Sequence, residues 1–195
     1  MMAEAAKHNV DQGAHIIDIN MGCPAKKVCR KLAGSALLQD EDLVARLLDA
    51  AVNAVDAPVT LKTRLGFENG RENILRVAKR AEQAGIAAIA IHGRTREDMY
   101  TGTARYELIR EVKDSIGIPV IANGDIISTD AARQALAQSG ADGVMIGRGA
   151  QGKPWLLARV AHDLFGAPAP VIPQGADFAR MVSDHYEAII RFYGE

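Results

Sequence analysis

The run Ala87-Ala88-Ile89-Ala90-Ile91-His92 decides the fold class, because it is apolar at every position except the last. A strand with one face in water alternates between apolar and polar residues, whereas a strand buried on both faces is continuously apolar. Such strands are typical of parallel sheets that helices cover. Gly93 and Arg94 follow the run, so polar chemistry begins where this predicted strand ends.

Strands and helices alternate along the rest of the chain, which predicts right-handed βαβ units and a parallel α/β sheet. Asp40 and Ser128 are of the residue types that cap helix N-termini. The predicted strands span residues 15–20, 58–63, 87–92, 118–122 and 142–146. The predicted helices span residues 2–13, 40–55, 72–84, 106–115 and 128–139.

Two parallel folds compete, the doubly wound sheet and the TIM (β/α)8 barrel. A doubly wound dinucleotide fold carries a glycine-rich fingerprint after its first strand, and none follows residues 15–20. Polar residues instead follow successive strands, which is typical of the barrel. These pairs are Asn20 and Cys23, Lys62 and Arg64, His92 and Arg94, Asn123 and Asp125, and Gly147 and Arg148.

A barrel has eight strands, so the five predicted here indicate a partial TIM barrel that consists of the last five strands. We expect residues 1–166 to form this C-terminal part of a barrel. Residues 167–175 contain Pro168, Pro170 and Pro173 and are predicted to be a linker. Residues 176–195 are predicted to begin a truncated helical domain.

Composition narrows the function classes. The 195 residues carry a formal net charge of −1 and include two cysteines. Two cysteines do not form a disulfide framework, and a zinc site would need a second pair of ligands that the sequence lacks. We therefore expect a cytoplasmic protein without a metal. No run of about 18 apolar residues predicts a membrane span. With this net charge, a nucleic-acid partner would need a local basic patch.

Cys23 stands in the stretch Asp18-Ile19-Asn20-Met21-Gly22-Cys23-Pro24, just past the first predicted strand. Gly22 allows a sharp turn, and Pro24 favours an extended backbone at Cys23. The thiol is therefore presented at a stiff corner between strand and loop. Taken alone, such a cysteine is more often a small buried hydrophobic residue.

The late stretch Gly147-Arg148-Gly149 offers backbone N–H groups and a positive charge after the last predicted strand. In barrels, the loops after the last two strands commonly bind phosphate, and Asn123-Gly124-Asp125 supplies the neighbouring loop. Lys62 and Arg64 favour an anionic or electron-rich ligand at the same rim. His92 is as consistent with a structural histidine as with a ligand contact.

Five motifs, in this order, resemble the successive strand-end motifs of tRNA-dihydrouridine synthases. They are Asn20-Met21-Gly22-Cys23-Pro24, Leu61-Lys62-Thr63-Arg64-Leu65-Gly66, His92-Gly93-Arg94-Thr95, Ala122-Asn123-Gly124-Asp125-Ile126 and Ile146-Gly147-Arg148-Gly149. The resemblance covers nearly the whole chain. The chain is most similar to the bacterial B-type branch of the family, and the stretch Lys31-Leu32-Ala33-Gly34-Ser35-Ala36-Leu37-Leu38 adds to this similarity. The resemblance implies that the family's first three strands and most of its helical domain are missing from this chain.

The resemblance implies an enzyme that binds FMN, reduces it with NADPH and reduces a uridine in the D-loop of tRNA. It implies that Cys23 is the catalytic proton donor and that Asn20 and Arg64 contact the substrate. Cys29 receives no role. The residues that it implies for FMN are Lys62, His92, Asn123, Gly124, Asp125, Gly147 and Arg148.

Two alternatives stay open from the sequence. The first is another FMN-dependent barrel oxidoreductase that acts on a small molecule and would not need the helical domain after Pro173. The second is an inert fragment that binds phosphate or RNA without turnover. For the complete protein we expect tRNA as the partner, no membrane, no protein partner and a monomer.

Overall fold

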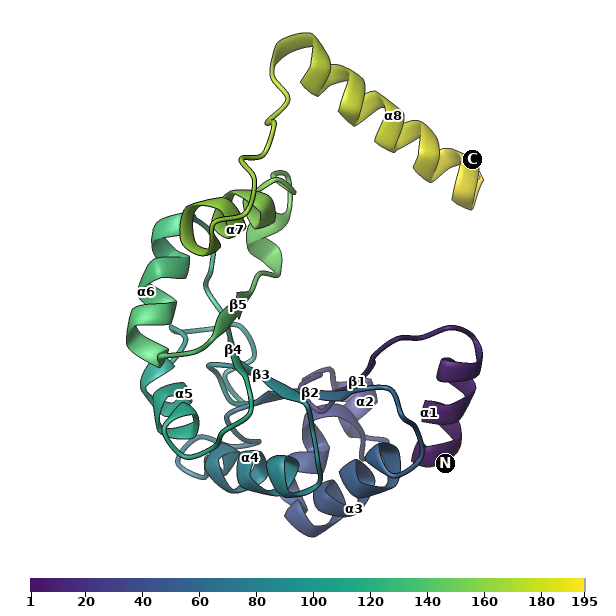
Figure 1. The fold of residues 1–195 in the computed structure, drawn as a ribbon, viewed down its shortest axis with the longest axis vertical. Coiled ribbons are helices and arrows are strands. Elements are labelled where there is room, and N and C mark those ends of the chain that lie inside the picture. Colours follow the sequence, from purple (N-terminus) through teal and green to yellow (C-terminus); the bar gives the residue numbers. More distant parts are fainter. Residues whose placement is uncertain (195) are drawn as a thin grey trace.

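The computed structural model describes residues 1–194, and it shows an α/β fold built on a parallel sheet (Figure 1). The strands are β1 (Ile17–Asn20), β2 (Val59–Arg64), β3 (Ala88–His92), β4 (Val120–Asn123) and β5 (Gly143–Met145). They lie side by side in chain order, and every neighbouring pair is parallel. The predicted parallel α/β class is confirmed, and the arrangement is consistent with part of a TIM barrel.

The outer side of the curved sheet is covered by α3 (Glu41–Val52), α4 (Ile74–Gln83), α5 (Tyr106–Lys113) and α6 (Thr129–Ser139) (Figure 1). Helix α1 (Met2–Asp11) lies beside the β1 end of the sheet, and α7 (Leu156–Phe165) lies beside the β5 end. Both predicted N-caps are confirmed: the Asp40 carboxylate accepts a hydrogen bond from the Leu43 N–H at 2.9 Å, and the Ser128 hydroxyl accepts one from the Ala131 N–H at 3.1 Å.

Helix α4 begins at Ile74, two residues later than the sequence predicts, because the preceding side chains are used elsewhere. The Glu72 carboxylate accepts a hydrogen bond from Arg105, and the Asn73 amide donates to the Leu38 carbonyl at 2.8 Å. Four short or late elements were not predicted. They are α2 (Lys26–Cys29), α7 and the 3₁₀ turns η1 (Gly34–Gln39) and η2 (Arg148–Ala150).

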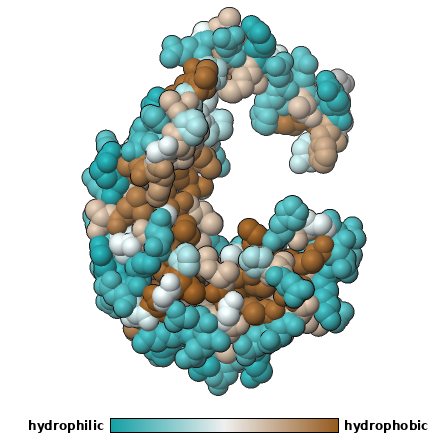
Figure 2. All heavy atoms as spheres, in the orientation of Figure 1, coloured by the Kyte–Doolittle hydropathy of each residue, from teal (hydrophilic) through white to brown (hydrophobic). Residues whose placement is uncertain are grey.

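The core lies between the sheet and the outer helices. Leu61 and Ile89 from the strands and Leu48, Val77 and Ile109 from the helices are completely buried. Burial on both faces of the sheet was expected, and that expectation is wrong in part. The inner face is only half-buried, and in β1 both Asp18 and Asn20 are exposed, because helices cover one face and β1 and β5 remain edges of an open sheet. Figure 2 shows hydrophobic residues along this inner side.

The predicted helix after the proline-containing linker is confirmed as α8 (Gly175–Tyr193), which extends away from the sheet (Figure 1). Its apolar stripe is exposed, with Val182 at 49% and Tyr186 at 63%. Phe178 meets Trp155 edge-on, with ring centroids 6.1 Å apart. One helix does not make a domain, so the helical domain stays a prediction, and Glu195 lies outside the described residues. Among residues 1–194, no helix combines the length and the apolarity that crossing a bilayer requires.

Candidate active site

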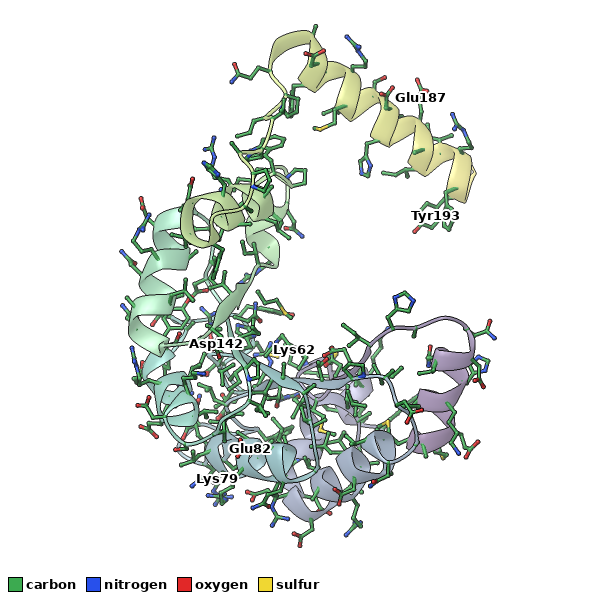
Figure 3. All side chains as sticks on the ribbon, viewed as in Figure 1. Lys62, Lys79, Glu82, Asp142, Glu187 and Tyr193 are labelled. Carbon is green, nitrogen blue, oxygen red and sulfur yellow. The ribbon has the colours of Figure 1, made fainter. Side chains whose placement is uncertain are left out.

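A cavity of about 650 Å³ opens at the carboxyl ends of the five strands. All ten residues that the sequence predicts as site residues line it: Asn20, Cys23, Lys62, Arg64, His92, Asn123, Gly124, Asp125, Gly147 and Arg148. Figure 3 shows Lys62 on the inner side of the arc, whereas Lys79 and Glu82 of α4 lie on the outer side. The structure therefore brings the predicted residues together; the role of each stays a prediction.

Strand register explains why residues far apart in sequence meet here. Asn20 pairs with Lys62 across β1 and β2, and Arg64 pairs with His92 across β2 and β3. His92 pairs in turn with Asn123 across β3 and β4. Because neighbouring parallel strands end at one edge, each polar strand end adds a side chain to the same rim.

The Cys23 corner is held by the side chain of Asn20. The Asn20 Oδ1 accepts hydrogen bonds from the N–H groups of Gly22 at 3.0 Å and Cys23 at 3.1 Å. This oxygen therefore shapes the turn that carries the thiol. The Cys23 side chain is half-buried and lines the cavity.

Arg64 ties two loops to the end of β2. Its Nε donates to the Gly22 carbonyl at 2.8 Å, and its Nη1 donates to the carbonyls of Thr95 at 2.9 Å and Met99 at 2.8 Å. Only 3% of this residue is exposed. Three of its five N–H groups thus hold backbone, so the structure gives Arg64 a supporting role, and a substrate contact stays a prediction.

Asp125 is paired with a buried arginine. Its carboxylate receives two hydrogen bonds from the Arg94 guanidinium, at 2.8 and 2.9 Å, and a third from the Ala104 N–H at 2.8 Å. Arg94 also donates to the carbonyls of Thr101 and Gly102. The pair fastens residues 95–104 beside the cavity. The carboxylate of Asp125 is therefore engaged with protein groups, although its loop lines the site.

Burial and neighbouring cations lower the pKa values of two groups in the cavity. Burial lowers the pKa of Lys62 to about 8, and the Arg64 guanidinium adds to this effect. Burial, together with Arg64, Lys62 and Arg94, lowers the pKa of His92 to about 3. His92 is therefore neutral near pH 7 and acts there as a hydrogen-bonding group rather than a charge.

The two glycine-containing loops after β4 and β5 touch each other. A Cβ on Gly149 would stand 2.1 Å from the Ile126 carbonyl oxygen, so only glycine fits at this contact. The Asn123 side chain donates to the Met145 carbonyl at 2.8 Å. By contrast, a Cβ on Gly147 would meet open space. Gly147 therefore leaves the backbone open to close approach by a ligand.

Tyr100 lines the cavity and was missed by sequence reasoning. Its ring lies under the guanidinium groups of Arg148, at 4.8 Å, and Arg64, at 5.5 Å. It also stands 6.4 Å from the His92 ring, centroid to centroid. No strand-end signal marks Tyr100, because it sits in a loop eight positions after His92 and reaches the site only through the fold of that loop.

The set of donors suits an anionic, phosphate-bearing group. Arg148, Lys62 and the backbone beside Gly147 supply positive charge and open space at one rim. Within residues 1–194, no three His, Cys, Asp or Glu side chains gather in a way that could hold a metal ion.

Comparison with known proteins gives the same family for the whole chain. The family model described as dihydrouridine synthase (Dus) matches residues 1–195. A probable tRNA-dihydrouridine synthase of Rhodobacter capsulatus is 56% identical over 193 residues, which cover 99% of this chain and 60% of that protein. The tRNA-dihydrouridine synthase B of Pseudomonas putida is 55% identical and is matched over 100% of this chain and 58% of its own length. The chain thus spans about 60% of the length of these relatives.

Solved structures with low sequence identity share the fold alone. A putative phosphonomutase from Burkholderia cenocepacia superposes with a TM-score of 0.61 at 16% identity, covering 97% of this chain and 90% of its own. A mandelate racemase/muconate lactonizing enzyme from a Jannaschia species gives a TM-score of 0.58 at 21% identity, over 85% of this chain and 40% of its own. Sequence identity, by contrast, is specific: this chain belongs to the dihydrouridine synthase family, and it is similar to bacterial members named tRNA-dihydrouridine synthase B.

Proposed function

We propose that this chain carries the active site of an FMN-dependent tRNA-dihydrouridine synthase, which reduces the C5–C6 double bond of a uridine in the D-loop of tRNA. The observation that carries the proposal is one cavity in which a thiol faces a cationic rim at the carboxyl ends of parallel strands. The names of the relatives support the same reaction and substrate.

The residues of the cavity suit FMN. Arg148 and the open backbone at Gly147, together with the adjoining loop of Asn123 and Gly124, would hold the phosphate and the ribityl chain. Lys62 would place its charge at the electron-rich edge of the ring system. His92, neutral near pH 7, would contact the ring without adding charge. The chemistry that FMN would supply there, once reduced by NADPH, is a hydride for C6 of the uracil.

Cys23 would supply the proton that C5 of the uracil needs. A thiol placed within reach of the reacting carbon is able to act as a general acid. Asn20 fixes the backbone that carries this thiol. To reach the cavity, the uridine has to leave its base stack, as in other enzymes that act on a flipped base.

A cationic segment beside the thiol supports RNA as the substrate. Lys26, Lys27, Arg30 and Lys31 follow Cys23 closely and are all exposed. Residues 19–39 contain no Asp or Glu, although the whole chain has a net charge of −1. Such a local concentration of positive charge is the basic patch that a nucleic-acid partner requires.

The test uses the natural protein that contains this chain. It is incubated with FMN, NADPH and tRNA that lacks dihydrouridine. The tRNA is then digested to nucleosides, and their masses are measured by mass spectrometry. The proposal predicts a nucleoside heavier than uridine by two hydrogens. Arg148→Ala and Lys62→Ala are expected to weaken FMN binding, while Lys79→Ala, on the outer side of the arc (Figure 3), leaves it unchanged. Unmodified tRNA, or equal flavin content in all three variants, would contradict the proposal.

A further inference from the structure

The carbonyl oxygen of Cys23 is a meeting point for three donors that come from the following segment. The Ser35 N–H donates to it at 3.1 Å and the Ser35 hydroxyl at 2.9 Å. The Cys29 thiol lies 3.7 Å from the same oxygen and 3.5 Å from the Ser35 hydroxyl. Two strong donors and one weak donor therefore fix the peptide group between Cys23 and Pro24.

The peptide group between Gly22 and Cys23 is fixed as well, because its N–H donates to the Asn20 Oδ1 at 3.1 Å. A residue has two soft backbone dihedrals, and holding the peptide groups on both sides determines both. Pro24 adds a further restriction on the backbone of the residue before it. The direction of the Cys23 thiol is then left to a single side-chain torsion.

Gly34 brings the donors this close. It has a φ of +60°, a conformation that suits glycine. A Cβ at this position would stand 2.8 Å from the Cys23 oxygen and 3.0 Å from the Cys23 Cβ. The backbone at Gly34, where η1 begins, therefore packs directly against the residue that carries the thiol.

We propose that Gly34, Ser35 and Cys29 are positioning residues that hold Cys23 in the orientation from which its thiol gives its proton. We call these three residues the carbonyl clamp. Ser35 is completely buried and lies outside the cavity lining that residues 1–194 provide, so it acts through Cys23 and not on a ligand. The inference rests on the proposed function, since it assigns the thiol a proton to give.

The first test separates positioning from stability in the flavin-loaded natural protein. Ser35→Ala removes the hydroxyl donor, and Ser139→Ala is its matched control. Ser139 is equally buried, and its hydroxyl donates to the Ala135 carbonyl at 2.6 Å, on helix α6. A displacement of about 1 Å in a reacting group costs up to about 100-fold in rate. We expect Ser35→Ala to slow oxidation of the pre-reduced flavin by tRNA by about 10- to 100-fold, with flavin content and reduction by NADPH unchanged, and Ser139→Ala to react at the parent rate.

The second test follows the thiol itself and needs no turnover. Residues 1–195 contain two cysteines, so Cys29→Ser and Cys29→Ala each leave Cys23 as the one thiol of this stretch, and its alkylation in the natural protein is followed on the peptide that carries it. Serine at position 29 keeps a donor beside the Cys23 carbonyl, and alanine does not. We expect iodoacetamide to alkylate Cys23 faster in Cys29→Ala than in Cys29→Ser, and faster again when Ser35→Ala is added, because a loosened corner exposes the half-buried thiol.

The outcomes separate this inference from the proposed function. Equal alkylation rates in Cys29→Ser and Cys29→Ala, or equal slowing of flavin oxidation in Ser35→Ala and Ser139→Ala, would overturn the carbonyl clamp. If Ser35→Ala does not fold, the comparison of the two Cys29 variants decides alone. If alkylation follows the expected order but the protein forms no dihydrouridine, the carbonyl clamp is supported and the proposed function is contradicted.

Discussion

Lys62 has a charge that can be titrated at moderately alkaline pH, because burial lowers its pKa to about 8. In the free protein its positive charge is therefore present at neutral pH and is lost as the pH rises through about 8. If that charge holds FMN, affinity for FMN falls over the same range, by about 10-fold for the loss of one charged hydrogen bond. Titration with FMN between about pH 7 and about pH 9.5 measures this.

Lys62→Arg is the matched control for that titration, since a guanidinium keeps its charge throughout the range. Its affinity for FMN is expected to stay level. A decline of the same size in Lys62→Arg would assign the effect to another group.

At the residue scale the sequence predicted which side chains gather at one rim of the sheet, because parallel strands end together; the roles of these side chains stay predictions. Ten strand-end residues, Lys62 and Asn123 among them, line one cavity. The hydrogen-bond partners of individual side chains could not be predicted. Asp125 is bound to Arg94, and Arg64 to three backbone carbonyls, because those partners come from the path of a loop. Tyr100 was missed for the same reason.

At the scale of elements, the cationic segment on and after α2 is expected to contact tRNA phosphates. Replacing Lys26, Lys27, Arg30 and Lys31 together by Gln removes four exposed positive charges. Each phosphate contact contributes about 0.7 to 0.9 to the slope of log affinity against log salt. We expect weaker tRNA binding and, with one phosphate contact per replaced residue, a slope smaller by about 3 to 4, with unchanged flavin content, in a filter-binding titration at several salt concentrations.

The control variant changes the same number of exposed cations on the outer helices and at the N-terminus: Lys7, Arg46, Lys79 and Arg133, each to Gln. It lowers the net charge equally but leaves the cavity rim intact. If both variants lose tRNA affinity to the same extent, the segment has no special place in binding.

Elements with strong local signals were predicted, and those that depend on tertiary contacts were not. Asp40 and Ser128 fixed two helix starts within one residue. Helix α2 has four residues and η1 is a 3₁₀ turn, so neither is long enough to show a hydrophobic period. The start of α4 depends on Asn73 and its contact with the Leu38 carbonyl, which no local pattern contains.

At the scale of the whole molecule, the open sheet is the main feature. The sequence predicted its parallel order but not its half-buried inner face. Strands β1 and β5 each have one unpaired side in the described sheet, and unpaired strand edges invite association with other chains. Ile127 and Met145, at 59% and 38% exposure, add apolar surface near this inner side.

We therefore expect residues 1–195, expressed alone, to self-associate or to unfold without a cooperative transition. Light scattering and thermal unfolding, compared with the natural protein that contains this chain, measure both properties. A monomeric chain that unfolds in one sharp transition would contradict this expectation.

The most direct test of the account is a single turnover that isolates the Cys23 thiol. The natural protein and its Cys23→Ala variant are loaded with FMN, reduced with NADPH and mixed with tRNA that lacks dihydrouridine, while the flavin absorbance and the tRNA product are followed. The account predicts that Cys23→Ala binds FMN and accepts electrons from NADPH as the parent does, yet makes dihydrouridine about 10²- to 10⁴-fold more slowly, which is the usual cost of losing a positioned general acid. Oxidation and product formation at the parent rate in Cys23→Ala would show that the thiol is not the proton donor.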